Sequence, residues 1–430
     1  MPMRKWSFLV FILVLAYTGQ TQSLSATEKK LVAAIDSGMP ASMELLKKTV
    51  DINSGTFNLK GVRQVGEIYA QELAALGFTV EWVTLPDSLK RAGHLVAWRK
   101  GSKGKKLFLI GHLDTVFEPD MPPNPFTMLN DSTATGQGVN DMKGGDVLVI
   151  AALKALQEQH LLDDATITVY FTGDEENAGR PRDISRGDFI SRARQHDIAL
   201  AFESADGLNK VATARRGASE WTIEVMAKQA HSSGIFGAGG YGAVYEASRI
   251  INEFRKQFST EKYLTVNPGL LVGGSEVKYD TAAQRGDIAG KTNIISPRAV
   301  VIGDLRFITA QQKERTRTRM RQIVAQSLPG TKASIRFKDG IPSMPPTAGN
   351  NKLVTILSGV NKSLGYGEVR PGDPGDRGAG DISYVAEWLD CLDGLGSSGK
   401  GAHAPGETIN LNEYPKLIKR AVLLIYRLTR

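Results

Sequence analysis

Residues 106–114 read Lys-Leu-Phe-Leu-Ile-Gly-His-Leu-Asp, a short apolar run that ends in a histidine and an aspartate. Three further apolar runs lead to metal-binding side chains: residues 166–172 to Asp174-Glu175-Glu176, residues 197–202 to Glu203, and residues 391–395 through a glycine loop to His403. Such runs are typical of strands buried on both faces of a parallel sheet. Because ligands bind beyond the carboxyl ends of strands in open α/β sheets, the four runs predict one shared site.

The rest of the pattern predicts an α/β fold with a mostly parallel sheet and an inserted domain. Helices are expected at residues 29–46, 62–76 and 145–159, and strands at 79–83 and 95–98. From Gly217 the pattern changes to strand 220–226, helix 242–258, strands 264–272 and 293–307, helix 310–327 and strand 333–337. This β-α-β-β-α-β order predicts a ferredoxin-like domain over 213–340. The α/β pattern resumes at 350–364, so the core is expected to consist of 27–212 and 341–430.

The N-terminus has the pattern of a secretory signal. Arg4 and Lys5 precede the apolar run 6–17, and small and polar residues follow as far as Ala26. We therefore expect residues 1–26 to be a signal peptide, cleaved after Ser25 or Ala26, and the mature protein to be periplasmic or secreted. The alternative is an uncleaved anchor, but a run of about 12 residues is too short to span a bilayer comfortably.

Charge and cysteine content limit the partners of the mature chain. The formal net charge of +8 falls by two, to +6, when Arg4 and Lys5 are removed. The basic residues are scattered without interleaved aromatic residues, which argues against nucleic acid and leaves a weak attraction for anionic substrates. Cys391 is the only cysteine, so no internal disulfide forms; its apolar surroundings favour a buried side chain over a reactive thiol.

The site residues suit divalent metals. His112 and Asp114 are two residues apart, so their side chains point to the same side of a strand end. Imidazole and carboxylate are the usual ligands of zinc and its neighbours. Asp141, in a glycine-rich stretch at 138–145, adds a carboxylate that two metals could share. Each motif alone is unremarkable, since acids at strand ends are common, but their joint occurrence predicts a metal site.

Taken together, these motifs and the segment 401–407 resemble the co-catalytic dizinc metallopeptidase family. That family includes glutamate carboxypeptidase of the carboxypeptidase G type, aminoacylase, succinyl-diaminopimelate desuccinylase and carnosinase-type dipeptidases. The resemblance covers essentially the whole mature chain, including the order of the domains.

The resemblance implies a role for each residue of the site. Two Zn²⁺ ions per chain would be bound, one by His112 and Glu203, the other by Glu176 and His403, with Asp141 bridging them and a cis peptide before Met142. Asp114 would accept a hydrogen bond from His112 and fix its tautomer. Glu175 would be the general base that takes a proton from the zinc-bound water.

The inserted domain also resembles the family. His231 is expected to cross a homodimer interface and stabilise the oxyanion in the partner's site, although a solvent-exposed loop histidine is the alternative. Asn293 and Arg306 would hold the substrate's carboxylate, and Gly399 would also contact substrate; the alternative for Arg306 is a surface arginine.

The expected function is an exported zinc exopeptidase that cleaves the C-terminal amide bond of a small peptide or N-acyl amino acid, most like glutamate carboxypeptidase. Glu203, in place of aspartate, resembles the carboxypeptidase and N-acyl-amino-acid hydrolase branch. A deacylase or dipeptidase remains the alternative, and the charged loop 372–381 departs from the family's usual glycine-rich stretch. A non-catalytic binding protein would require loss of Glu175 or of a ligand, and none is lost.

Overall fold

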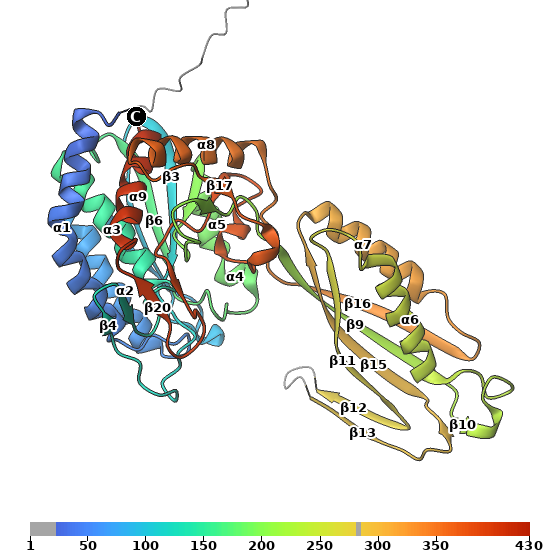
Figure 1. The fold of residues 1–430 in the computed structure, drawn as a ribbon. Coiled ribbons are helices and arrows are strands. Elements are labelled where there is room, and N and C mark those ends of the chain that lie inside the picture. Colours follow the sequence, from blue (N-terminus) through green and yellow to red (C-terminus); the bar gives the residue numbers. More distant parts are fainter. Residues whose placement is uncertain (1–22, 281–284) are drawn as a thin grey trace, which may run out of the picture.

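The computed structural model describes residues 23–280 and 285–430, which form an α/β core and a separate, elongated inserted domain (Figure 1). Most of the expected signal peptide, residues 1–22, lies outside the described residues. Within the described part, no helix combines the length and apolar character needed to cross a bilayer. Helix α1 (Ala26–Val50) starts at a capping box in which Ser25 and Glu28 each bond the other's backbone N–H. Cleavage after Ser25 would remove this cap.

The core is built on a six-stranded sheet in the order β1-β2-β6-β3-β7-β18. Strands β6, β3, β7 and β18 run parallel to one another, whereas β2 runs antiparallel to both β1 and β6. The strand bounds are β1 Thr79–Val83, β2 His94–Arg99, β3 Lys103–His112, β6 Ala165–Thr172, β7 Ile198–Ala201 and β18 Asp390–Leu392. The predicted α/β class is therefore confirmed.

The central strand β3 is apolar throughout its second half because both of its faces are covered. Leu107 and Leu109 belong to the larger core, which is formed with helices α1, α2 (Leu59–Ala75), α3 (Lys143–Glu158), α8 (Ala348–Ser363) and α9 (Tyr414–Leu428). Phe108 and Ile110 point to the opposite face, where they pack in a second cluster with Tyr170 and Phe189. Since successive residues of a strand face opposite sides, burial of both faces requires the uninterrupted run.

The inserted domain has the predicted β-α-β-β-α-β order, with an antiparallel sheet arranged β11-β15-β9-β16. Its elements are β9 Gly217–Ala227, α6 Gly242–Phe258, β11 Thr265–Gly274, β15 Arg298–Phe307, α7 Ala310–Val324 and β16 Thr331–Asp339. Figure 1 shows both helices over one face of this sheet. The two connections to the core run side by side, since Arg215 and Met344 exchange backbone hydrogen bonds.

Sequence patterns missed two small sheets. Strands β12 (Glu276–Asp280) and β13 (Arg285–Ala289) pair as an antiparallel extension of the inserted domain. A four-stranded sheet beside the metal ligands contains β4 (Thr127–Asn130), β5 (Thr133–Thr135), β19 (Gly399–Lys400) and β20 (Thr408–Asn410). The shorter elements are α4 Arg182–Ser185, α5 Gly187–Ala193, β8 Lys210–Val211, β10 Ala230–His231, β14 Ile294–Ile295 and β17 Arg370–Pro371. Strands of two to five residues are too short to show a hydrophobic period.

A glycine allows the largest buried side chain of the inserted domain to fit. Gly303 of β15 pairs with Trp221 of β9, and a Cβ atom at Gly303 would lie 2.1 Å from the Trp221 ring and 2.3 Å from the Asn267 carbonyl oxygen. We expect Gly303→Ala to lower the free energy of unfolding by about 1–3 kcal/mol through overpacking. Denaturant unfolding followed by circular dichroism measures this change.

The matched control is Gly269→Ala on the neighbouring strand β11, where the nearest atom to the new Cβ would be 3.7 Å away. Its effect should stay within about 0.5 kcal/mol. Equal destabilisation by the two substitutions would contradict the packing argument.

Candidate metal centre

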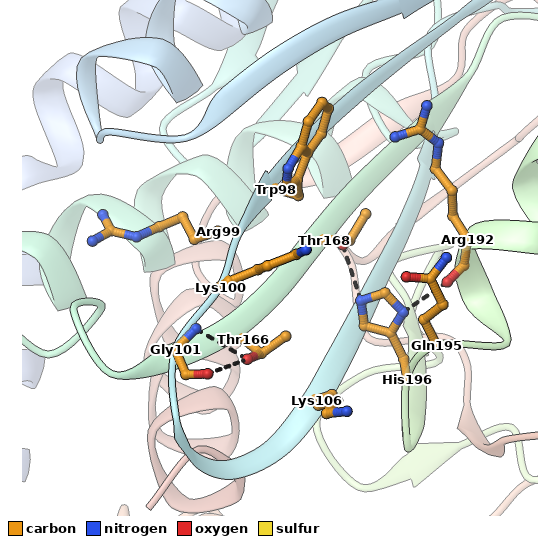
Figure 2. A pocket seen from close by; sticks show the side chains of 10 residues that line it. All are labelled: Trp98, Arg99, Lys100, Gly101, Lys106, Thr166, Thr168, Arg192, Gln195 and His196. Carbon is orange, nitrogen blue, oxygen red and sulfur yellow. Dashed lines mark hydrogen bonds between the residues drawn. The ribbon is translucent and has the colours of Figure 1, made fainter.

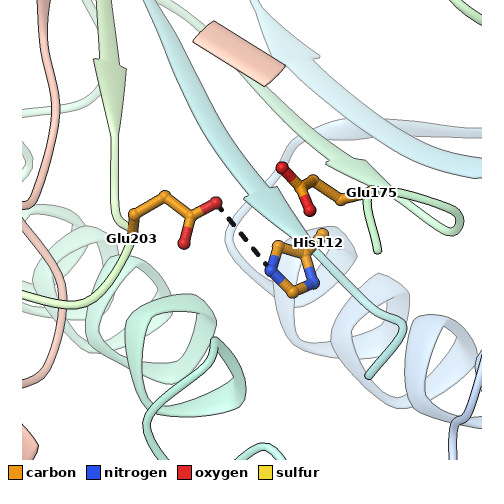
Figure 3. Close-up of side chains that lie close together, drawn as sticks. All are labelled: His112, Glu175 and Glu203. Carbon is orange, nitrogen blue, oxygen red and sulfur yellow. Dashed lines mark ion pairs between the residues drawn. The ribbon is translucent and has the colours of Figure 1, made fainter. Parts of the chain in front are cut away.

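The predicted site residues converge beyond the carboxyl ends of the core strands. His112 is the last residue of β3, Asp174-Glu175-Glu176 follow β6, and Glu203 follows β7. Asp141 directly precedes helix α3, and His403 lies in the loop between β19 and β20. Figure 3 shows Glu175 and Glu203 approaching His112 from two sides. The ligand atoms of these three residues lie within 4.8 Å of one another, as do those of His112, Asp141 and Glu176.

Asp141 lies between the two histidines. Its Oδ1 atom is 3.4 Å from Nε2 of His112, and its Oδ2 atom is 3.0 Å from Nε2 of His403. Glu203 approaches the same His112 nitrogen at 3.9 Å, and Glu176 approaches the His403 nitrogen at 3.2 Å. Asp141 thus faces both histidines, Glu203 lies on the side of His112, and Glu176 lies on the side of His403.

The charge distribution of this cluster fits bound cations. Hydrogen bonds to Asp141 and Glu176 raise the pKa of His403 to about 11. Burial alone would lower the pKa of His112, but its hydrogen bond to Asp141 and the charge of Glu203 raise it well above its usual value. Carboxylates that stabilise positive charge on two imidazoles would equally stabilise divalent metal ions. In addition, Oε1 of Glu176 is buried without a hydrogen-bond partner, as expected of a free ligand atom.

The loop that carries Asp141 is held by a residue to which the sequence assigned no role. The buried carboxylate of Glu407 accepts hydrogen bonds from the backbone N–H groups of Gly138, Asn140 and Asp141, at 3.0, 2.7 and 2.7 Å. Burial raises the pKa of Glu407 to about 7, although these three bonds act in the opposite direction. The peptide between Asp141 and Met142 is cis, as the resemblance implied.

The expected hydrogen bond from His112 to the Asp114 carboxylate is wrong in detail. Nδ1 of His112 is 2.9 Å from the backbone carbonyl oxygen of Asp114 and 3.6 Å from its carboxylate. The carbonyl fixes the tautomer, because an oxygen that can only accept requires a proton on Nδ1. The carboxylate instead accepts the backbone N–H groups of Glu175 and Glu176 and the hydroxyl of Thr56. Asp114 therefore positions the turn that carries Glu175 and Glu176.

A buried charge network supports the same turn from the other side. Arg186 is fully buried and donates to Asp174 at 2.5 Å and to Asp381 at 2.8 Å. Asp381 also accepts the hydroxyl of Thr172, the last residue of β6. This network was not predicted, because an arginine between two distant aspartates leaves no local pattern in the sequence.

The charged loop 372–381 lies close to the metal ligands. Arg377 donates to the backbone oxygen of Ser204, next to the ligand Glu203. Arg215 donates to the carbonyl of Gly378 at 2.8 Å and pairs with the buried Asp393 at 2.5 Å. These contacts anchor the loop at the edge of the site.

The predicted substrate residues of the inserted domain fall in two places: His231 and Asn293 lie near β10 and β14, whereas Arg306 lies where the domain joins the core, opposite Ala218. His231 of β10 is exposed at the far end of that domain, where its Nδ1 accepts the N–H of Ser233 at 3.2 Å (Figure 1). The backbone of Asn293 bonds to Ser232 in the same region. Arg306 pairs with Asp304 at 2.7 Å. Gly399 alone lies beside the site, in β19, where a Cβ would be 2.9 Å from the Asn140 side chain.

The α/β core thus brings histidines and carboxylates together at its strand ends, in groups that could hold a metal ion. The sequence profile of peptidase family M20/M25/M40 matches residues 108–427, and the chain belongs to that family. The family is metal-dependent, and the chain is a metallopeptidase by this relationship.

Several relatives are similar over most of their length. Carboxypeptidase G2 of Pseudomonas sp. (strain RS-16) is 27% identical over 429 residues, covering 96% of this chain and 95% of that protein. Succinyl-diaminopimelate desuccinylase of Bordetella avium is 24% identical over 305 residues, covering 66% of this chain and 73% of that protein.

Solved structures share the fold at low identity. Aminopeptidase PepT from Bacillus cereus has a TM-score of 0.69 at 15% identity and covers 90% of this chain and 98% of its own. The Bacillus subtilis YXEP protein, described as a dinuclear metal binding peptidase, has a TM-score of 0.60 at 14% identity, with 92% and 99% covered.

Glu407 is expected to act on the metal ligands through the backbone. In Glu407→Gln, an amide group faces one or more of the three N–H donors, so the loop carrying Asp141 loses its anchor. Metal affinity should fall about 10–100-fold, the usual cost of losing a partner that orients a ligand. Competition with a chromophoric chelator measures it. The exposed Glu158 provides the control Glu158→Gln, and unchanged affinity in Glu407→Gln would contradict the role.

Proposed function

We propose that this chain is an exported, zinc-dependent exopeptidase that hydrolyses the C-terminal amide bond of a small peptide or N-acyl amino acid. The observation that supports this most strongly is the Asp141 carboxylate, which faces His112 on one side and His403 on the other, with Glu175 beside them. The similarity to carboxypeptidase G2 along nearly the whole chain supports carboxypeptidase activity as the leading proposal. The similarity to desuccinylases keeps N-acyl-amino-acid deacylase as the alternative, together with a dipeptidase.

In this proposal, each residue of the site has a separate role in hydrolysis. His112 and Glu203 would hold one zinc ion, Glu176 and His403 the other, and Asp141 both. When bound, such ions polarise the scissile carbonyl and make a water molecule more acidic. Glu175 accepts the proton of the attacking water and delivers it to the leaving nitrogen as the C–N bond breaks. Burial and the nearby Glu203 raise the pKa of Glu175 well above its usual value, which favours a group that must hold a proton between these two steps.

Metal content and turnover separate the base from the ligands. In Glu175→Ala, we expect nearly two equivalents of zinc per chain, as in the unaltered protein, and a turnover lower by about 10²–10⁴. In Glu203→Ala, zinc content should fall as well. Elemental analysis and hydrolysis of a panel of N-acyl amino acids and dipeptides measure both. Near-normal turnover in Glu175→Ala would assign the base elsewhere, and no zinc in the supplemented unaltered protein would refute the metal assignment.

The separation of His231 from the metal ligands leads to a dimer in our proposal. A histidine that is exposed at the end of another domain can complete the site only if domain closure or a second chain brings it there. We propose that His231 of one chain serves the partner's site as an oxyanion donor, with Asn293 and Arg306 holding the substrate carboxylate.

Mixing two inactive variants tests this arrangement. Glu175→Ala lacks the base, and His231→Ala should lose about 10²–10³ in turnover by lacking one oxyanion donor. In a mixed dimer, one of the two sites retains both residues, so activity should reappear after subunit exchange. If mixed dimers form and stay inactive, His231 acts within its own chain or not at all.

A further inference from the structure

A cavity lined by several basic side chains lies at the opposite end of the core sheet from the candidate metal centre. It has a volume of about 540 Å³ and is lined by Trp98, Arg99, Lys100, Gly101, Lys106, Thr166, Thr168, Arg192, Gln195 and His196 (Figure 2). Lys106 and His112 belong to the same strand, β3, so at about 3.3 Å per residue they are roughly 20 Å apart. This cavity, which we call the basic pocket, is therefore distinct from the candidate metal centre.

The polar side chains at the floor of the basic pocket are held by hydrogen bonds to one another and to the backbone. His196 Nδ1 lies 2.9 Å from the carbonyl oxygen of Arg192, so this nitrogen carries the proton. Its Nε2 atom then accepts the Thr168 hydroxyl at 2.9 Å, and burial lowers the pKa of His196, consistent with a neutral ring. Thr166 exchanges two hydrogen bonds of 3.1 Å with the backbone of Gly101.

The rim carries cations of two kinds. Arg99 and Arg192 are already paired, the first with Asp163 and the second with Asp188 and Glu81. Within the described part of the chain, the ammonium groups of Lys100 and Lys106 have no carboxylate within ion-pair distance. The nearby Asp197 accepts the backbone N–H of Lys106, not its ammonium group. Figure 2 shows the Lys100 side chain extended toward Thr168, with Gln195 opposite. Two lysines without a carboxylate partner thus line the cavity.

We propose that the basic pocket binds a small molecule that carries a phosphate group. The available cations are lysines, which bind phosphate oxygens as point charges, whereas planar carboxylate recognition favours the arginine fork, and both arginines here are engaged. The volume is within the range of small-ligand sites and larger than one phosphate needs. Trp98 also lines the cavity, and the Arg192 guanidinium lies over its ring at 5.2 Å from the centroid.

Calorimetric titration of the zinc-loaded protein with phenyl phosphate, at low ionic strength to limit screening, tests the proposal. The pocket variant is Lys100→Gln/Lys106→Gln. The control is Lys103→Gln/Lys105→Gln, which removes the same charge from exposed lysines outside the pocket. Both variants should keep their hydrolytic activity, which shows that they fold.

The unaltered protein and the control should bind phenyl phosphate saturably with similar affinity, and the pocket variant should bind about tenfold more weakly or not at all. Phthalate, a dicarboxylate of similar size and charge, should bind more weakly than phenyl phosphate. Absence of saturable binding, unchanged binding in the pocket variant, an equal loss in the control, or equal binding of phthalate would each overturn the proposal. Binding that persists in the pocket variant would place the ligand at the metal centre.

Discussion

The structure depends on bringing several carboxylates together without leaving their charges uncompensated. Asp114, Asp141, Glu175, Glu176 and Glu203 surround one histidine at the centre of the sheet edge. Carboxylates at such distances repel one another strongly in a partly buried site. Positive charge at the two imidazoles offsets this repulsion, and metal ions at the proposed site would offset it further.

Backbone N–H groups and a buried arginine stabilise the other carboxylates in and around this cluster. Glu407 accepts hydrogen bonds from three peptide N–H groups, and Asp114 accepts two. Arg186 forms ion pairs with both Asp174 and Asp381. Removing one partner of a buried charge costs several kcal/mol, because the other partner is left unpaired. The supporting groups are thus as constrained as the proposed ligands themselves.

The sequence indicated His112 and Glu203 as candidate ligands because each ends or follows a run of buried strand, and the spacing of two placed Asp114 beside His112. Asp141 and His403 lie outside such runs and were indicated by their glycine-rich segments and by the family resemblance. Spacing could not show that the backbone oxygen of Asp114, and not its carboxylate, accepts from that histidine. Glu407 and Arg186 escaped prediction because their partners are far away in the chain. The short strands β12, β13 and β19 escaped because a few residues show no period.

The paired backbone hydrogen bonds between Arg215 and Met344 place the two ends of the inserted domain next to each other. The chain therefore leaves the core and returns to it at a single point. A tight turn could close that gap, and the core sheet would keep every strand and all five proposed ligands. The architecture is therefore modular: a smaller ancestral hydrolase could have acquired the second domain without changing the path of its own chain.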